Sequence, residues 1–308
     1  MKKYCKNKIK VKIKLKENVS LFFNNSVYAN GSLKKPIKVI SKKSKSLPWG
    51  TFGIKNANEV ILKHVHFNNG SGYKDSLKEY SAMLSIHNVK NFKLQDCKLS
   101  NSFVVDDMLH VVYSNGSIIN SDFENSFADA IDIDISKVTF DGLRIKNSGN
   151  DGLDLMSSEV LVTNSKIIFS KDKGISIGEK SYVSVHNSKI EKNFKGIEVK
   201  DRSKAIIDTS KIINNSTDIS AYKKNWRYGG PGYIYLINSE TNLGNISLKD
   251  ESQIYVDKQI NQEKKINNLI NKIKYSELKE IKNFDLQNNV FQSFMHYVDK
   301  HTNTLNSQ

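Results

Sequence analysis

Apolar and polar residues alternate along the chain in short runs that recur at a constant interval. Two apolar columns repeat every 22 residues, and they are separated by a single polar position: Leu109, Ile131, Leu153, Ile175, Ile197 and Ile219, with Val111, Ile133, Leu155, Ile177, Val199 and Ala221. Strict alternation is the period of a β-strand, and no unit shows the 3.6-residue period of a helix. The central half of the chain is therefore predicted to consist of repeated strands.

Each unit contains two further strand positions. A second alternating run follows the first, as at 160–162, 183–185 and 205–207, and a third apolar position follows at Ile145 and Ile167. A 22-residue unit is too short for a helix–turn–helix repeat, and it lacks the leucine and asparagine pattern of leucine-rich repeats. The pattern predicts an all-β fold, a right-handed parallel β-helix with about 22 residues and three short strands per coil.

The regular units lie between two less regular ends. We predict an N-terminal cap over 1–49, the β-helix over 50–240, and the last strands with a helical cap over 241–308. In the N-terminal cap, residues 8–16 alternate lysine with apolar residues, which protects a sheet edge. Helical spacing is found near the C-terminus, at Ile266, Leu269, Ile270 and Ile273 and again at Phe291, Phe294, Met295 and Val298. A polar loop over 68–80 is a candidate wall for a site.

The position between the two apolar columns must face outward, because side chains alternate across a strand. Down the coils this position reads His110, Asp132, Asp154, Ser176, Glu198 and Ser220. Three residues earlier stand Asp107, Asp129, Asp151, Lys173, Lys195 and Thr217. Asp134 stands two residues after Asp132 on the same face. Two neighbouring coils thus gather five carboxylates, with Lys173 on the next coil: Asp129, Asp132, Asp134, Asp151 and Asp154.

The charge distribution argues against nucleic acid as the partner. The chain has a formal net charge of +15, yet residues 106–159 hold eleven acidic and three basic residues, a local balance of −8. An acidic island does not suit a groove that follows phosphates, and no basic groove is interleaved with aromatic residues. High lysine content can simply keep an elongated protein in solution. No apolar run is long enough to span a membrane, and no secretory signal begins the sequence, so the localisation is left open.

Five carboxylates on one patch repel one another. Two of them about 5 Å apart cost roughly 3 kcal/mol at an effective dielectric constant of 20. A shared proton, a hard cation or the neighbouring lysine would relieve that repulsion. Oxygen ligands without cysteine favour Ca²⁺ or Mg²⁺ over zinc, and no organic cofactor is indicated. The alternative is a solvated acidic stripe without a ligand.

The repeats resemble those of the pectin-lyase-like superfamily of parallel β-helix proteins, over roughly 50–240. Four segments also resemble β-helix modules attached to CotH-type kinase-like domains: FADAIDID at 127–134, GNDGLDLM at 149–156, DKGISIGE at 172–179 and AYKKNWRYGG at 221–230. The resemblance implies an extracellular or cell-surface location. It also implies that the chain can be one module of a longer protein.

Better understood members of that superfamily imply two chemistries. Polygalacturonase-type hydrolases carry aspartates on consecutive coils, which Asp151 and Asp154 match, followed by a Gly-His-Gly motif. Here Asp172, Lys173 and Gly174 replace that motif, and the Asn-Thr-Asp signature is absent. Lyases and epimerases of this fold use a Lys, Arg or His base, often with Ca²⁺. Lys173 fits this second chemistry better, although a plain ion pair with Asp151 is the alternative.

We therefore predict a carbohydrate-active protein that binds or acts on a polysaccharide, anionic ones included, along its acidic face. A lyase or epimerase is preferred to a glycoside hydrolase. The catalytic candidates are Asp132, Asp151, Asp154 and Lys173, and the metal-ligand candidates are Asp129, Asp132, Asp134, Asp151 and Asp154. The substrate-binding candidates are His110, Lys195, Glu198, Lys200, Trp226 and Arg227. The alternative is a non-catalytic binding or structural module of a surface or coat protein.

Overall fold

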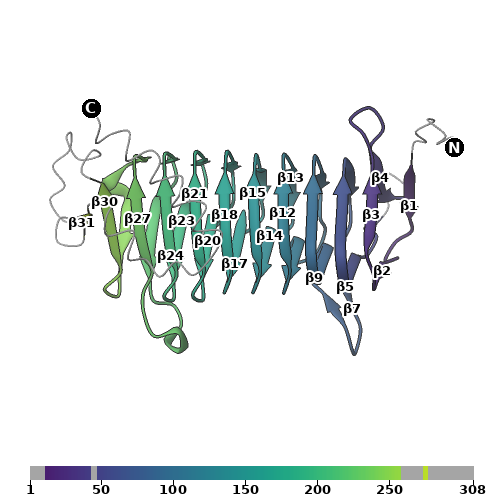
Figure 1. Ribbon diagram of the computed structural model, residues 1–308, viewed down its shortest axis with the longest axis horizontal. Coiled ribbons are helices and arrows are strands. Elements are labelled where there is room, and N and C mark those ends of the chain that lie inside the picture. The colour runs from purple at the N-terminus through teal and green to yellow at the C-terminus, as the bar shows by residue number, and fades with distance from the viewer. Residues whose placement is uncertain (1–10, 43–46, 258–272, 277–308) are drawn as a thin grey trace, which may run out of the picture.

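The chain forms a right-handed parallel β-helix, seen from the side in Figure 1. The computed structural model describes residues 11–42, 47–257 and 273–276. Within these residues the only helical elements are two 3₁₀ turns, η1 (Trp226–Tyr228) and η2 (Leu243–Asn245). The predicted C-terminal helices lie outside the described residues, apart from 273–276, which form a strand. The predicted fold class is confirmed.

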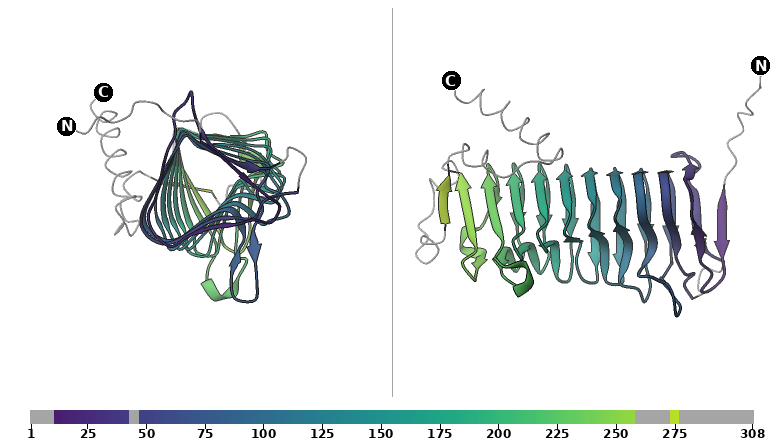
Figure 2. Two further views of the ribbon diagram at one scale, coloured as in Figure 1. Left: turned by 90° about the vertical axis from the view of Figure 1, so that its right-hand side faces the viewer. Right: turned by 60° about the horizontal axis from the view of Figure 1, so that its bottom comes forward.

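The coils contribute strands to three stacks, which enclose a three-sided cross-section (Figure 2, left). The first stack contains β2 (Leu21–Phe23), the first halves of β5 (Phe52–Lys63) and β9 (Ala82–Gln95), β11 (Asp107–Val112), β14 (Asp129–Asp134), β17 (Leu153–Met156), β20 (Lys173–Gly178), β23 (Lys195–Lys200), β26 (Thr217–Tyr222) and β29 (Ile246–Leu248). The outward face of this first stack carries the candidate site.

The second stack is continuous with the first through the long strands β5 and β9. It contains β3 (Val27–Asn30), the second halves of β5 and β9, β12 (Asn115–Ile119), β15 (Lys137–Asp141), β18 (Glu159–Thr163), β21 (Tyr182–His186), β24 (Lys204–Asp208), β27 (Tyr233–Ile237), β30 (Gln253–Asp257) and β31 (Ile273–Ser276). The third stack contains β1 (Lys12–Leu15), β4 (Ile37–Ser41), β6 (Val65–Asn68), β10 (Lys98–Ser100), β13 (Asp122–Ser126), β16 (Arg144–Ser148), β19 (Lys166–Ile168), β22 (Lys189–Glu191), β25 (Lys211–Ile213) and β28 (Glu240–Thr241).

The strand register confirms the 22-residue repeat. Ile131 pairs with Leu153, Leu153 with Ile175, and Ile175 with Ile197. All four side chains are fully buried, as their columns predict. Burial of one such aliphatic side chain contributes roughly 1.5–3 kcal/mol. Because a single coil cannot enclose its inward face, that contribution exists only when coils stack.

Regular stacking extends beyond the predicted 50–240 segment. Strands β2, β3 and β4 already form a coil that pairs with β5 and β6. Strand β1 pairs with β4, with Leu15 buried and Lys12 and Lys14 exposed, as the lysine alternation predicts. After residue 240, β29 and β30 continue the first and second stacks. The division into three parts remains a prediction.

Two segments project from the solenoid on the same side (Figure 1, bottom; Figure 2, left). One is an antiparallel hairpin of β7 (Tyr73–Lys74) and β8 (Glu79–Tyr80), which lies within the loop predicted as a site wall. The other is the loop after β26 that contains η1. Among the described residues, no helix has the length and apolar character needed to cross a membrane.

Candidate functional site

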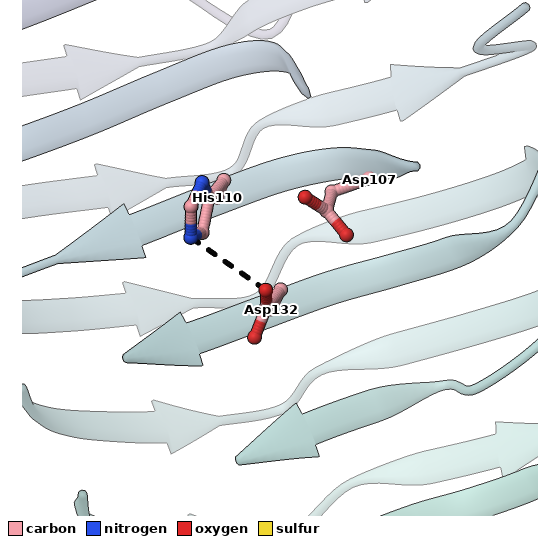
Figure 3. A group of neighbouring side chains, drawn as sticks. All are labelled: Asp107, His110 and Asp132. Atoms are coloured by element: carbon pink, nitrogen blue, oxygen red, sulfur yellow. Dashed lines mark ion pairs between the residues drawn. The ribbon is translucent and has the colours of Figure 1, made fainter. Parts of the chain in front are cut away.

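The candidate site is a group of three side chains on two adjacent coils (Figure 3). Asp107 and His110 lie on β11, and Asp132 lies on β14, where it pairs in register with His110. The Nε2 atom of His110 is 3.6 Å from Oδ2 of Asp132. One nitrogen or oxygen atom from each of the three side chains lies within 4.8 Å of the others. The site therefore combines an imidazole and two carboxyl groups in one small volume.

Two further residues hold the His110 ring in place. The Ser81 hydroxyl donates to Oδ2 of Asp107 at 2.6 Å and lies 2.9 Å from Nδ1 of His110. On the other side, Nε2 of His110 is 3.2 Å from Oδ2 of Asp134. When His110 carries both ring protons, Nδ1 donates to Ser81 and Nε2 donates to Asp134. The ring is therefore linked through Ser81 to Asp107 of β11 and directly to Asp134 of β14.

Asp129 and Asp151 bind backbone amides of the next coil. Oδ1 of Asp129 accepts from the N–H of Asp151 at 2.6 Å and from Nδ2 of Asn150 at 2.7 Å. Oδ1 of Asp151 accepts from the N–H of Lys173 at 2.9 Å. Both carboxyl groups are buried, with exposed fractions of 7% and 2%. We call this arrangement the aspartate ladder.

Burial and mutual repulsion favour the protonated form of several of these carboxyl groups. Burial, and then the charge of Asp151, raises the pKa of Asp129 to about 8. Burial also raises the pKa of Asp151 to about 6, against the opposing effect of Lys173. The pKa values of Asp107 and Asp132 are raised as well, chiefly by burial, and for Asp132 then by the charges of Asp107, Asp134 and Asp154. A proton or a cation therefore stabilises this surface at neutral pH.

Lys173 forms an ion pair with Asp151, which the sequence analysis gave as the alternative to a role as catalytic base. Its Nζ lies 3.4 Å from both oxygens of Asp151 and 2.5 Å from Oδ2 of Asp172. Burial alone would lower the pKa of Lys173, but these two carboxylates outweigh burial and raise it. A lysine held in its charged form is a poor proton acceptor. Lys173 supplies positive charge at the edge of the acidic surface.

The remaining polar residues of the first stack form a separate cluster. Glu198 is fully buried and pairs with Lys195, while its Oε1 accepts from the Tyr222 hydroxyl at 3.1 Å and its Oε2 from Ser220 at 3.1 Å. Lys200 donates to Ser176 at 2.8 Å. Although these residues occupy outward positions, they satisfy one another, and Glu198 presents no surface to a ligand.

Trp226 and Arg227 lie in the loop that follows β26, at a distance from His110 along the solenoid. The column His110, Asp132, Asp154, Ser176, Glu198 and Ser220 takes five register steps to reach β26, which is about 24 Å at strand spacing. Their loop is anchored by Oδ1 of Asp201, which accepts from the N–H groups of Lys224 and Asn225 at 2.8 and 2.7 Å. Trp226 is 77% exposed, and the Arg227 guanidinium lies 5.9 Å from its ring.

Sequence reasoning did not place Asp106, Asp107 or Ser81 in the site. Two groups of possible metal ligands occur in the described part of the chain: Asp107 with His110 and Asp132, and Asp106 with Asp107 and Asp129. Asp107 belongs to both groups. The sequence did contain the information needed to find Asp107, because it occupies the same position in its repeat as Asp129 and Asp151 do in theirs. The site is therefore centred one coil earlier than the five predicted carboxylates, and Asp134 and Asp154 border it.

The comparisons with known proteins agree with the fold. Residues 107–250 match the family described as the right handed beta helix region. A search of curated proteins found no match. Among solved structures, the enzymatically active domain of bacteriophage CBA120 tailspike protein 2 is similar at 10% identity and a TM-score of 0.50, covering 78% of this chain and 43% of that one.

Two other solved structures are similar with lower scores. The full-length CBA120 tailspike protein 2 has 10% identity and a TM-score of 0.47, with 78% of this chain and 39% of that chain covered. An alginate lyase from Paenibacillus sp. has 12% identity and a TM-score of 0.44, with 80% and 93% covered. The chain spans about two fifths of the length of the tailspike chains. The family match covers residues 107–250, and the strand stacking of these residues is that of a right-handed parallel β-helix.

Proposed function

We propose that this protein acts on an anionic polysaccharide along the outward face of its first stack, as a lyase or epimerase. The observation that carries the proposal is the position of His110. Its imidazole lies 3.6 Å from Asp132 and 3.2 Å from Asp134, and all three side chains are partly exposed. A proton acceptor and a proton donor thus stand side by side at the surface, which is the requirement for general acid–base catalysis.

The proposed step begins at the carbon that bears the sugar carboxylate. His110 in its neutral form removes the proton from that carbon, and Ser81 and Asp134 hold the imidazolium that results. In an elimination, the electron pair forms a carbon–carbon double bond and expels the glycosidic oxygen, which takes its proton from Asp132. In an epimerisation, His110 keeps the removed proton, a water molecule donates a proton to the opposite face of the carbon, and the glycosidic bond is kept. The raised pKa of Asp132 supports its role as the acid.

A divalent cation fits one part of the site better than another. Asp106, Asp107 and Asp129 supply oxygen atoms only, which suits Ca²⁺ or Mg²⁺, whereas the His110 group includes a nitrogen. When bound there, the cation would neutralise the sugar carboxylate and make the neighbouring proton more acidic. Asp132, Asp134, Asp151 and Asp154, which the sequence also proposed as ligands, would border that ion.

The test is a measurement of bond cleavage and of epimerisation. The full chain is incubated with alginate, pectate and rhamnogalacturonan, substrates chosen from the names of structurally similar lyases. Elimination appears as ultraviolet absorbance of the new double bond, and epimerisation as exchange of the sugar proton with deuterium from solvent. His110→Gln should abolish either signal. Absence of both signals with every polysaccharide, with and without Ca²⁺, would contradict the catalytic proposal.

A non-catalytic module is the second candidate, and the aspartate ladder favours it. Asp129 and Asp151 bind the backbone of the next coil, so part of the acidity serves the scaffold. In that case the acidic residues would hold a cation that fastens adjacent coils, and the outward face would bind a polysaccharide without changing it. Binding that survives His110→Gln, without turnover by the wild type, would favour this candidate.

The location and the wider context of the chain follow from the proposed ligand. Polysaccharides of this kind lie outside cells, so we place the protein in the extracellular space or at a cell surface. The resemblance to modules attached to CotH-type domains supports a role as one part of a larger protein. Immunodetection of the native protein in cell fractions would test both proposals.

A further inference from the structure

A hollow of about 520 Å³ lies beside the candidate site, between the β7–β8 hairpin and the first coils. Specific ligand pockets typically enclose about 300–1,000 Å³. The lining residues that bear on its chemistry are Asn24, Lys55, Asn56, Lys78, Tyr80 and His87. None of them belongs to the candidate site of Asp107, His110 and Asp132, so this hollow is a separate surface.

A row of rings connects the hollow to the candidate site. The ring of Tyr80 stacks on that of His87, with centroids 5.1 Å apart and an interplanar angle of 11°. His87 in turn meets the edge of His110 at 5.1 Å and 81°. Gly53 makes room for this arrangement, because a Cβ there would lie 3.0 Å from the Phe22 ring and 3.1 Å from the Tyr80 ring. A ligand in the hollow would thus lie next to one at His110.

His87 has an unused polar atom. Its Nε2 is buried and has no hydrogen-bond partner among the described residues. Burial, followed by the charges of His110 and Lys55, lowers the pKa of His87 to about 4, so the ring is neutral at physiological pH. A buried polar atom without a partner is costly, and a ligand hydroxyl that bonds to it would remove that cost.

The two charged residues of the hollow without an ion-pair partner in the described part of the chain are both lysines. Lys55 and Lys78 are exposed and form no ion pair with any other residue that the structure describes. Glu79, the acidic residue at this wall, is paired with Lys74 at 2.9 Å. The hollow therefore offers two lysine ammonium groups and a hydrogen-bonding nitrogen. Lysines attract carboxylates.

We propose that this hollow is a subsite for one acidic sugar residue of the polysaccharide whose neighbouring residue lies over His110 and Asp132. This inference rests on the proposed function, and it names the ligand class: a sugar that carries a carboxylate. Lys55 and Lys78 bind the carboxylate, and His87 bonds to a hydroxyl. His87 pairs with Val112, and Val112 pairs with Asp134. His87 and Asp134 are therefore two register steps apart, which is about 10 Å along the solenoid.

The test measures binding rather than turnover. Oligogalacturonate and oligomannuronate hexamers are titrated by calorimetry into the full chain, with neutral hexasaccharides of glucose as the reference ligand. The double variant Lys55→Gln, Lys78→Gln should weaken binding of the acidic ligand by about tenfold or more and reduce its salt dependence. The matched control Lys90→Gln, Lys146→Gln removes two exposed lysines outside the hollow and should leave the affinity unchanged.

His87→Phe keeps a flat ring but removes both nitrogens. It should weaken oligosaccharide binding without lowering the melting temperature, because the ring nitrogen has no partner to lose. An unchanged affinity in both His87→Phe and the double lysine variant would overturn the subsite, as would a wild type that binds neither acidic hexamer. Binding that depends on these residues in a protein without turnover would uphold the subsite while the catalytic proposal fails.

Discussion

The imidazole of His110 lies 3.6 Å from the carboxyl group of Asp132, its in-register neighbour on the next coil. The two residues are 22 positions apart in sequence, so the repeat itself creates the contact. A single coil would present only one of these groups. The chemistry of the site therefore depends on the stacking of β11 on β14 as much as on the residue types.

The first prediction concerns this pair. Asp132→Asn and His110→Gln should each lower turnover of the polysaccharide by about 10²-fold or more, the usual contribution of a general acid or base. Both variants should keep the wild-type circular dichroism spectrum, because both side chains are on the outward face. Glu124→Gln, on β13 of the third stack, is the control and should retain full activity. Equal activity in all four proteins would remove His110 and Asp132 from the mechanism.

The second prediction concerns pH. The pKa of Asp129 is about 8 and that of Asp151 about 6, both above the ordinary value of 3.8. From about pH 4 upward, the folded protein therefore retains protons that the unfolded chain has released. This difference makes the free energy of unfolding fall as the pH rises toward about 8. Melting temperatures measured at constant ionic strength should decline over this range. A steady increase with pH would contradict the prediction.

The third prediction concerns Ca²⁺. Ca²⁺ that binds only the folded protein should raise the melting temperature, and the increase should grow with its concentration. Asp107→Asn should abolish the response, because Asp107 belongs to both groups of possible ligands. Asp154→Asn should preserve it, since Asp154 lies outside these groups. Loss of the response in Asp154→Asn would instead favour the wider ligand set that the sequence suggests.

The fourth prediction concerns the core. Leu153 is fully buried between Ile131 and Ile175 in its column. Leu153→Ala should reduce the free energy of unfolding by about 2–5 kcal/mol, as large-to-small core substitutions do. Leu153→Asp should abolish soluble expression, because it places a charge in that column. Chemical denaturation measures the first variant, and the soluble fraction of a lysate measures the second. Wild-type behaviour of Leu153→Asp would show that the column faces outward.

The fold was predictable because its main determinant is a period. Five equal steps from His110 to Ser220 predict both the inward column and the outward column, and strand register reproduces them. The lysine alternation near the N-terminus was also informative, since Lys12 and Lys14 are exposed and Leu15 is buried. A pattern that repeats without insertions specifies which residues become neighbours.

The composition of the site was less predictable, for two physical reasons. Ser81 follows the β7–β8 hairpin, which interrupts the repeat, so no constant step leads from Ser81 to Asp107 and His110. Alternation describes strands only, and Asp129 and Asp151 stand where a turn meets a strand. Their side chains bind backbone amides instead of facing solvent. Glu198 does occupy the predicted outward position, but Lys195, Ser220 and Tyr222 cover it.

The hydrogen bonds of Asp107 and Asp129 determine how many oxygen atoms each can offer to a cation held among Asp106, Asp107 and Asp129. Asp129 commits Oδ1 to two N–H donors, and Asp107 commits Oδ2 to the Ser81 hydroxyl. Each of these carboxyl groups therefore has one oxygen to offer. Ca²⁺ takes 6–8 oxygen ligands, so most of its coordination shell must come from elsewhere. Sugar hydroxyl and carboxylate oxygens can complete that shell. In that case the saccharide coordinates the cation, and the binding of each increases the affinity for the other.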